Sequence, residues 1–241
     1  KVFALVGGVG TATGMAVKDL IIESKVPWVG MATGSGGFAH PPSRYVFSLY
    51  PNYACEAGLL TRHAVDALKK TKIAVLYQND DYGKEGLRGV EAALAAKGLK
   101  PVEKVSVEVL DRDLSSHVMK LKASGADAVI LWVLPTHAAI TLGAAAKVGF
   151  APQWITSSSL SDAPLMHKLT EGRWDGVIFA SFLDLGIDAK FRIDIYARNG
   201  YCRVLHLAVE FFICVAGPIF LLPKFIKDAR NAIAFDSFDR V

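Results

Sequence analysis

The sequence predicts an α/β fold built on a parallel, doubly wound sheet. Over residues 1–185, short β-rich runs alternate with helical patterns, and most of these runs are nearly continuous in Val, Ile, Leu and Ala. A strand covered by helices on both faces needs such a continuous run, whereas a half-exposed strand alternates apolar and polar residues. Each strand–helix–strand unit then adds one parallel strand to the sheet.

Eight segments are predicted as strands, and 72–77 and 127–133 are the clearest. The others are 2–6, 27–31, 45–49, 102–109, 153–156 and 176–181. Helices are predicted at 12–24, 52–70, 83–97, 113–124, 136–148 and 162–170. Gly98 and Gly125 stand where two of these helices are expected to end, because glycine readily adopts the left-handed conformation that terminates a helix.

The composition limits the class of protein. The chain has 241 residues, of which 52% are hydrophobic and 21% charged, as in folded globular chains. The net charge of +4 comes from 27 basic and 23 acidic residues without a long basic run, so no nucleic-acid partner is expected. Cys55, Cys202 and Cys214 have no CxxC spacing and the six histidines are scattered. No metal and no cofactor are therefore predicted.

Both ends of the chain depart from the strand–helix pattern. The sequence starts directly on the apolar run 2–6 without a signal peptide, so we expect upstream sequence to be missing. Residues 204–222 are almost entirely apolar but contain His206, Glu210 and Pro218. This length just suffices to cross a membrane, although a mid-span glutamate is costly. A membrane-associated segment, a buried helix and a tail foreign to the fold are all open interpretations.

Glycines and hydroxyl side chains follow the predicted strands, at the edge where parallel sheets bind ligands. Loops 7–14 and 31–37 follow the first two strands, and later loops carry Tyr82, Thr136 and Ser157–Ser159. Hydroxyls and main-chain amides bind anions well but supply no general acid or base. The motifs GxSxG and HExxH and the phosphate-binding P-loop are all missing from the sequence. The pattern therefore predicts the binding of a small anionic ligand and not its conversion.

The first loop also admits two other interpretations. Gly8, Gly10 and Gly14 loosely resemble a dinucleotide-binding fingerprint, but no acidic residue for the ribose ends the second strand. Alternatively, the loop is a tight turn with Thr11 capping the following helix.

Structural roles are equally open for two later loops. Residues 31–37 form either a flexible connection or a loop that hydrogen-bonds a ligand. Asp80 or Asp81 is expected to cap the helix that follows the strand 72–77.

Taken in order, these loops resemble the type I periplasmic solute-binding proteins, in the branch that includes the leucine/isoleucine/valine-binding proteins of ABC transporters. The most specific match is residues 73–84, with the sequence Ile-Ala-Val-Leu-Tyr-Gln-Asn-Asp-Asp-Tyr-Gly-Lys. Residues 121–127, Val26-Pro27 and Ala32-Thr33-Gly34 support it. The resemblance covers roughly residues 1–185.

The resemblance implies a two-lobed α/β fold with parallel, doubly wound sheets. Residues 1–49 correspond to an incomplete first lobe, residues 50–185 to the second lobe and residues 186–241 to an atypical tail. The chain is expected to cross between the lobes near 49–51 and again near 182–185. Because the family's opening strand–helix–strand segment is absent, we expect exposed sheet edges that favour association.

The resemblance also implies the ligand site. The matching positions are Gly10, Thr11, Ala32 and Thr33 in the first lobe and Tyr82, Thr136 and Ser158 in the second. The family's amino-acid binders carry an acid in the loop that matches 157–159, where it meets the ligand's ammonium group. Here that loop holds only serines, with Asp162 slightly later. We therefore expect a small carboxylate, amide or amino-acid-like solute, and a branched-chain amino acid less so.

The implied function is that of an extracytoplasmic, periplasmic substrate-binding protein without enzymatic activity, whose closed form is recognised by an ABC transporter permease. A ligand-sensing domain of a receptor or regulator is the first alternative, and the apolar segment 204–222 is its only local support. A nucleotide-dependent enzyme is the second alternative. The missing acid after the second strand argues against it.

Overall fold

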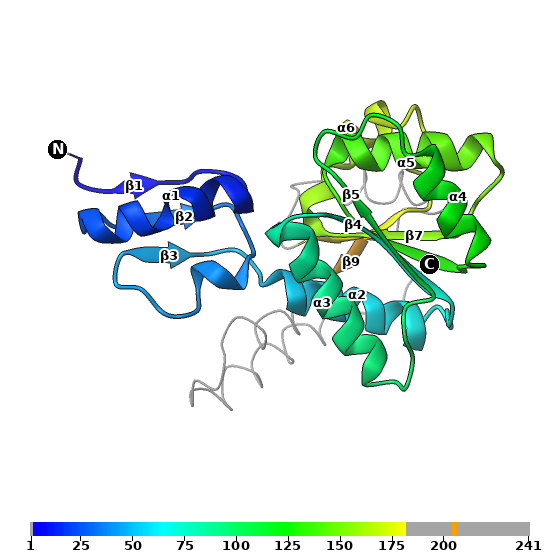
Figure 1. Cartoon of the computed structure of the whole chain (residues 1–241), viewed down its shortest axis with the longest axis horizontal. Coiled ribbons are helices and arrows are strands. Elements are labelled where there is room, and N and C mark those ends of the chain that lie inside the picture. Colours follow the sequence, from blue (N-terminus) through cyan, green and yellow to red (C-terminus); the bar gives the residue numbers. More distant parts are fainter. Residues whose placement is uncertain (1, 182–203, 207–241) are drawn as a thin grey trace, which may run out of the picture.

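The chain forms two parallel sheets with flanking helices (Figure 1), and the computed structural model describes residues 2–181 and 204–206. We name the first part the three-stranded unit. Its elements are β1 (Leu5–Val6), α1 (Thr11–Ser24), β2 (Trp28–Met31), the 3-10 helix η1 (Gly36–Phe38) and β3 (Val46–Ser48). The sheet order is β1-β2-β3, and both pairings are parallel.

The rest of the described chain forms the six-stranded unit. Its strands are β4 (Ile73–Gln78), β5 (Glu103–Val107), β6 (Ala128–Trp132), β7 (Gln153–Thr156), β8 (Ile178–Ser181) and β9 (Val204–His206). Its helices are α2 (Tyr53–Asp66), α3 (Asp81–Ala95), α4 (Ser115–Ala123), α5 (Pro135–Lys147), η2 (Ser158–Leu160) and α6 (Ala163–Leu169). Together the two units confirm the predicted α/β class with parallel sheets.

The strand order of the larger sheet creates a switch point. The order is β5-β4-β6-β7-β8-β9, and all pairings are parallel. The chain therefore moves from β4 outward to β5 and then returns to the other side of β4 for β6. Loops that leave β4 and β6 diverge at this point, which is where open α/β sheets bind their ligands.

Helices cover both faces of the larger sheet, and its strands alternate between two cores. Ala74 and Leu76 of β4 face a core that includes residues of α4, α5 and α6. Their neighbours Ile73 and Val75 face a core built with α2 and α3. Figure 1 shows these helix groups on opposite sides of the sheet. Because both faces are covered, the sequences of these strands are nearly continuous apolar runs.

All eight predicted strands and six predicted helices are present, and the differences lie at their ends. The first strand spans only Leu5–Val6, against 2–6 predicted. Gly98 and Gly125 have the positive φ angles, +69° and +68°, expected after a helix. Asp80, and not Asp81, caps α3 by accepting a hydrogen bond from Gly83 N at 3.0 Å.

Thr11 does not cap α1, so that interpretation of the first loop is wrong. The N-cap is Gly10, which supplies no side chain, and Thr11 is already the first helical residue. Its hydroxyl instead lies 2.8 Å from the hydroxyl of Thr33. The Thr11 hydroxyl therefore pairs with a residue distant in sequence and does not cap the helix, as the local pattern had suggested.

The segment after β8 is described only in part. Residues 204–206 form β9, a strand the sequence did not predict, which pairs in parallel with β8. The expected second crossing near 182–185 and the rest of the tail 186–241 lie outside the described residues. Among the helices that the structure describes, none has the length and apolar character to cross a membrane.

Candidate functional site

The four residues expected to bind ligand from the first lobe lie together in the three-stranded unit. The hydroxyls of Thr11 and Thr33 are 2.8 Å apart, and both residues are buried. Gly10 N donates to Ala32 O at 3.4 Å, so the loops after β1 and β2 run side by side. The first turn of α1 contains no acidic residue and no side-chain cap. Its main-chain N–H groups therefore leave the end of the helix suited to an anion.

The loop after β2 is packed tightly against the six-stranded unit and is not a loose connection. Tyr53 N donates to Gly34 O at 2.9 Å. A Cβ atom on Gly34 would lie 1.9 Å from Pro51 O and 2.7 Å from the Tyr53 ring. Glycine is required at this position because only a residue without a side chain allows the two segments to approach so closely.

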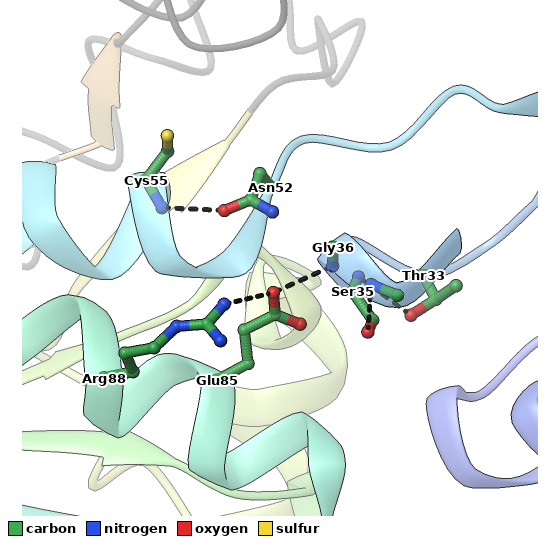
Figure 2. Close-up of polar contacts among 8 residues, drawn as sticks. Thr33, Ser35, Gly36, Asn52, Cys55, Glu85 and Arg88 are labelled. Carbon is green, nitrogen blue, oxygen red and sulfur yellow. Dashed lines mark hydrogen bonds and ion pairs between the residues drawn. The ribbon is translucent and has the colours of Figure 1, made fainter. Parts of the chain in front are cut away.

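A buried carboxylate also joins the two units, as Figure 2 shows. Glu85 Oε1, on α3, accepts a hydrogen bond from Gly36 N at 2.8 Å. The same oxygen accepts one from Arg88 Nη2 at 2.9 Å. Glu85 is 7% exposed, whereas the Arg88 side chain is 68% exposed. We call this the Glu85–Gly36 contact, and it fixes the loop after β2 to α3.

Two tyrosines and a tryptophan form an aromatic cluster beside this loop. The ring of Tyr53 lies 5.1 Å from that of Tyr82 and 5.9 Å from that of Trp132, edge to face in both cases. Burial raises the pKa values of both tyrosines above their usual range. Both hydroxyls therefore stay protonated at neutral pH and act as neutral hydrogen-bonding groups.

Two serines of the loop after β7 lie beside the tyrosine hydroxyls. Ser157 Oγ lies 3.0 Å from the hydroxyl of Tyr82. The side chains of Ser159 and Thr33 lie near the Tyr53 hydroxyl, and Ser159 also lies near that of Tyr82, and these polar neighbours lower the tyrosine pKa values against the effect of burial. Hydroxyls of both units therefore lie near one another here. We call them the hydroxyl network, and its members are Thr11, Thr33, Tyr53, Ser159, Tyr82 and Ser157.

The middle serine of this loop binds a fully buried glutamate. Glu56 Oε1 accepts from Ser158 N at 2.5 Å, and Oε2 accepts from Ser158 Oγ at 3.0 Å. Glu56 lies on α2, 102 residues away in sequence. Burial raises its pKa to about 7, although the two hydrogen bonds from Ser158 act in the opposite direction. The loop itself holds no acid, but the fold brings the carboxylate of Glu56 from α2 to Ser158.

Thr136 is less well connected than the other predicted residues. It is exposed in the first turn of α5, and no hydrogen bond within residues 2–181 joins it to the hydroxyl network. Asp162, the nearest acid in sequence to the serines, caps α6 by accepting from Leu165 N. The described segments also contain no group of His, Cys, Asp and Glu that could hold a metal ion.

Sequence reasoning missed three residues that organise this region, namely Tyr53, Glu56 and Glu85, whereas Ser157 and Ser159 were expected as part of a hydroxyl-bearing loop at the strand end. A signal for Glu56 was available in the pattern of α2. It lies three residues after Tyr53 and four before Leu60, both of which face the core. A glutamate on that apolar face needs a buried partner, because an unpaired buried charge is strongly unfavourable. The identity of the partner could not be read from the helix.

Comparison with known proteins identifies the family. Residues 1–199 match the periplasmic binding protein family. A Leu/Ile/Val-binding protein homologue from Brucella melitensis biotype 1 is 28% identical over 125 residues, which are 52% of this chain and 34% of that protein. The chain thus matches about a third of the length of this curated relative.

Solved structures agree with this match. A substrate-binding periplasmic protein from Ralstonia solanacearum has 25% identity and a TM-score of 0.69, covering 96% of this chain and 69% of that one. A branched-chain amino acid ABC transporter protein from Thermus thermophilus, solved with bound valine, has 17% identity and a TM-score of 0.67. That comparison covers 88% of this chain and 57% of the other. The two parallel sheets, the switch point and the family match together show that this chain belongs to the periplasmic binding protein family.

Proposed function

We propose that this chain is the solute-capturing part of an extracytoplasmic substrate-binding protein of an ABC transporter. Its ligand is a small carboxylate, amide or amino-acid-like solute held between the three-stranded and six-stranded units. The observation that carries the proposal is the hydroxyl network, in which the Thr11–Thr33 pair of one unit and the Tyr82–Ser157 pair of the other both have Tyr53 or Ser159 as polar neighbours. Polar groups from two separate sheets converge there.

The three-stranded unit supports the anionic end of such a ligand. The N-terminus of α1 has no side-chain cap and no acidic residue in its first turn. Thr11 and Thr33 add hydroxyls at the same place. Main-chain N–H groups at a helix start favour a carboxylate, so this end holds the acid group of the solute.

The connection between the units supports closure around a ligand. The chain passes from β3 to α2 in the short stretch between Ser48 and Tyr53. Two packed units joined by a short connection open and close as rigid bodies. A ligand that bonds to both units stabilises the closed arrangement by its higher affinity for it. In this proposal, a permease then recognises the closed form.

A thermal-shift screen tests the proposal. The whole chain is heated with valine, leucine, benzoate, 4-methylpentanoate or acetamide, each at 1 mM (roughly the upper end of the affinities expected). At least one probe is expected to raise the melting temperature, because a ligand that binds only the folded state stabilises it by mass action. A flat response to every probe contradicts the proposed function.

Two substitutions then assign any binding to the hydroxyl network. Thr33→Ala and Tyr82→Phe each remove one hydroxyl, so each weakens binding of the probe by about 1–3 kcal/mol. Thr71→Ala, at an exposed position of the six-stranded unit, is the matched control and leaves affinity unchanged. Wild-type affinity in both test variants rules out this location for the site.

A further inference from the structure

The loop after β2 obtains the acceptors for its main-chain N–H groups from two sources. Ser35 N donates to Thr33 Oγ1 at 3.2 Å, and Gly37 N donates to Ser35 Oγ at 3.3 Å, so these acceptors lie within the loop. Gly36 N instead donates to Glu85 Oε1 at 2.8 Å, across the boundary between the two units. Figure 2 shows this bond reaching from α3 to the loop. One N–H group in the middle of the loop therefore depends on the opposite unit.

The carboxylate of Glu85 fits closely into this position. A Cβ atom on Gly36 would lie 2.8 Å from Glu85 Oε1 and 3.1 Å from Asn52 Nδ2, so a side chain there would push the carboxylate away. Arg88 Nη2 donates to the same oxygen at 2.9 Å and supplies an opposite charge. Without such a partner, a buried carboxylate is strongly unfavourable. The close fit and the compensating charge indicate that this contact is a feature of the fold and not a chance approach of a surface side chain.

The loop is held at two points, and only one of them depends on the packing of the units. Lys18 of α1 donates to Gly37 O, so this bond lies within the three-stranded unit. If the units separated, this bond would remain, whereas Gly36 N would exchange Glu85 for water. Hydrogen bonds to charged groups are stronger than those between neutral groups, so the contact favours the packed arrangement. Because both partners belong to the protein, it does so whether or not a solute is bound.

We infer that Glu85 is a positioning residue for solute binding, which holds the loop after β2 in shape from the opposite unit. It acts through Gly36, close to Thr33 in the chain, and not by contact with the solute. The shape of the loop is thereby coupled to the packing of the units. The role of Glu85 in the loop does not depend on the proposed function, whereas its consequence for solute affinity rests on that function.

Amide hydrogen exchange of the whole chain, without any added solute, tests the role of Glu85 in the loop. In Glu85→Ala, the peptide 33–38 is expected to exchange about fivefold faster, because Gly36 N loses its acceptor and the loop opens more often. The segment 128–133 of β6 is the internal reference and keeps its rate, since a general loss of stability would accelerate both. Glu91→Ala, which breaks only the exposed pair with Lys104, is the control variant and changes neither rate.

Two further substitutions separate the hydrogen bond from the packing of the side chain. Glu85→Gln keeps an amide oxygen that accepts from Gly36 N, whereas Glu85→Leu keeps a side chain of similar size without any acceptor. In the glutamine variant, exchange of 33–38 is expected to stay within about twofold of the wild-type rate. In the leucine variant it is expected to be as fast as in Glu85→Ala. This order assigns the effect to the acceptor and not to lost packing.

Solute kinetics then test the consequence for binding. Association and dissociation of valine, leucine and benzoate are followed by tryptophan fluorescence in a stopped-flow instrument. In Glu85→Ala, the dissociation rate constant is expected to rise about fivefold, because a solute leaves when the units separate, whereas the association rate constant stays within about twofold. A residue with only a structural role would leave both constants unchanged in the folded protein.

The outcomes distinguish the two proposals. If none of the solutes binds, the proposed function fails, and hydrogen exchange alone still decides whether Glu85 holds the loop. Unchanged exchange of 33–38 in Glu85→Ala, or equal acceleration of 33–38 and 128–133, overturns the inference. Faster exchange of the loop with an unchanged dissociation rate leaves the function standing and overturns the positioning role. If Glu85→Ala does not fold, Glu85→Leu provides the same comparison.

Discussion

The two units differ in how completely their apolar residues are covered. In the six-stranded unit, segments 73–76 and 128–133 of the central strands are fully buried. In the three-stranded unit, Val6, Val9 and Leu20 remain 83%, 81% and 67% exposed. Both sheets are parallel and both were predicted from apolar runs. An apolar run in the sequence therefore predicts a strand, but the helices packed against that strand decide whether it is buried.

This difference leads us to expect that the two units contribute unequally to stability. Helices cover both faces of the larger sheet, whereas the smaller one has a core of five buried residues, Ile21, Trp28, Met31, Phe38 and Val46. We expect the six-stranded unit to supply most of the free energy of folding. The three-stranded unit contributes the Thr11–Thr33 pair and is attached to its neighbour through the loop 33–36.

The largest expected effect comes from the core of the larger sheet. Leu131→Ala removes a fully buried side chain from β6, so the free energy of unfolding falls by about 2–5 kcal/mol. Val6→Ala in β1 changes it by less than about 0.5 kcal/mol, because that side chain is mostly exposed. Urea denaturation of both variants measures the contrast. Equal losses would contradict the proposed division between the units.

The second prediction concerns pH and Glu56. Its folded pKa of about 7 lies above the ordinary value of 4.5, so folding favours the protonated form. The corresponding stability is complete below pH 4.5 and is lost as the pH rises from 4.5 to 7. The loss is about 3 kcal/mol for a shift of this size.

Glu56→Gln provides the control for that pH dependence. The substituted side chain does not titrate, so the unfolding free energy should lose this decline between pH 4.5 and 7. Glu91→Gln, on the exposed side of α3, should keep it. Denaturant titrations at pH 4.5, 6 and 8 compare the three proteins, and a decline that persists in Glu56→Gln would assign it to another group.

Gly34→Ala tests how closely the two units pack. The new methyl group would meet Pro51 O and the Tyr53 ring, and relieving the clash costs about 1–3 kcal/mol. Gly143→Ala on α5 is the matched control, because no atom lies within 4 Å of its added methyl group. Alanine has a higher helix propensity than glycine, so this control substitution should stabilise the protein slightly. Thermal melts distinguish the two, and equal melting temperatures would show that the loop can move aside.

The smallest expected effect is at the Glu85–Gly36 contact. Glu85→Ala removes the acceptor for Gly36 N, which costs about 1 kcal/mol and frees the three-stranded unit to move. We expect the radius of gyration from small-angle X-ray scattering to increase. Glu91→Ala breaks only the exposed pair with Lys104 and should leave it unchanged. Identical scattering from both variants would mean that other contacts hold the units together.

The local sequence pattern was sufficient to predict the helices and strands and part of the candidate site. Asp80, Gly98 and Gly125 have the roles expected of them, since a helix end depends on residues within one turn. Thr11 and Thr33 were expected in the same lobe, and the structure places them in two loops that leave neighbouring parallel strands. Thr11 was misassigned as a cap because local reasoning cannot weigh a partner 22 residues away against the nearest N–H group.

The sequence by itself determined the α/β class, the strand and helix positions and the hydroxyl-rich loops at the strand ends. Only the tertiary structure decided which hydroxyls pair, that Gly34 must lack a side chain, and that Glu56 lies beside Ser158. The physical reason is the distance along the chain over which each effect acts. Propensity and periodicity act over a few residues, whereas a buried charge and its partner are brought together by packing across 102 residues of chain.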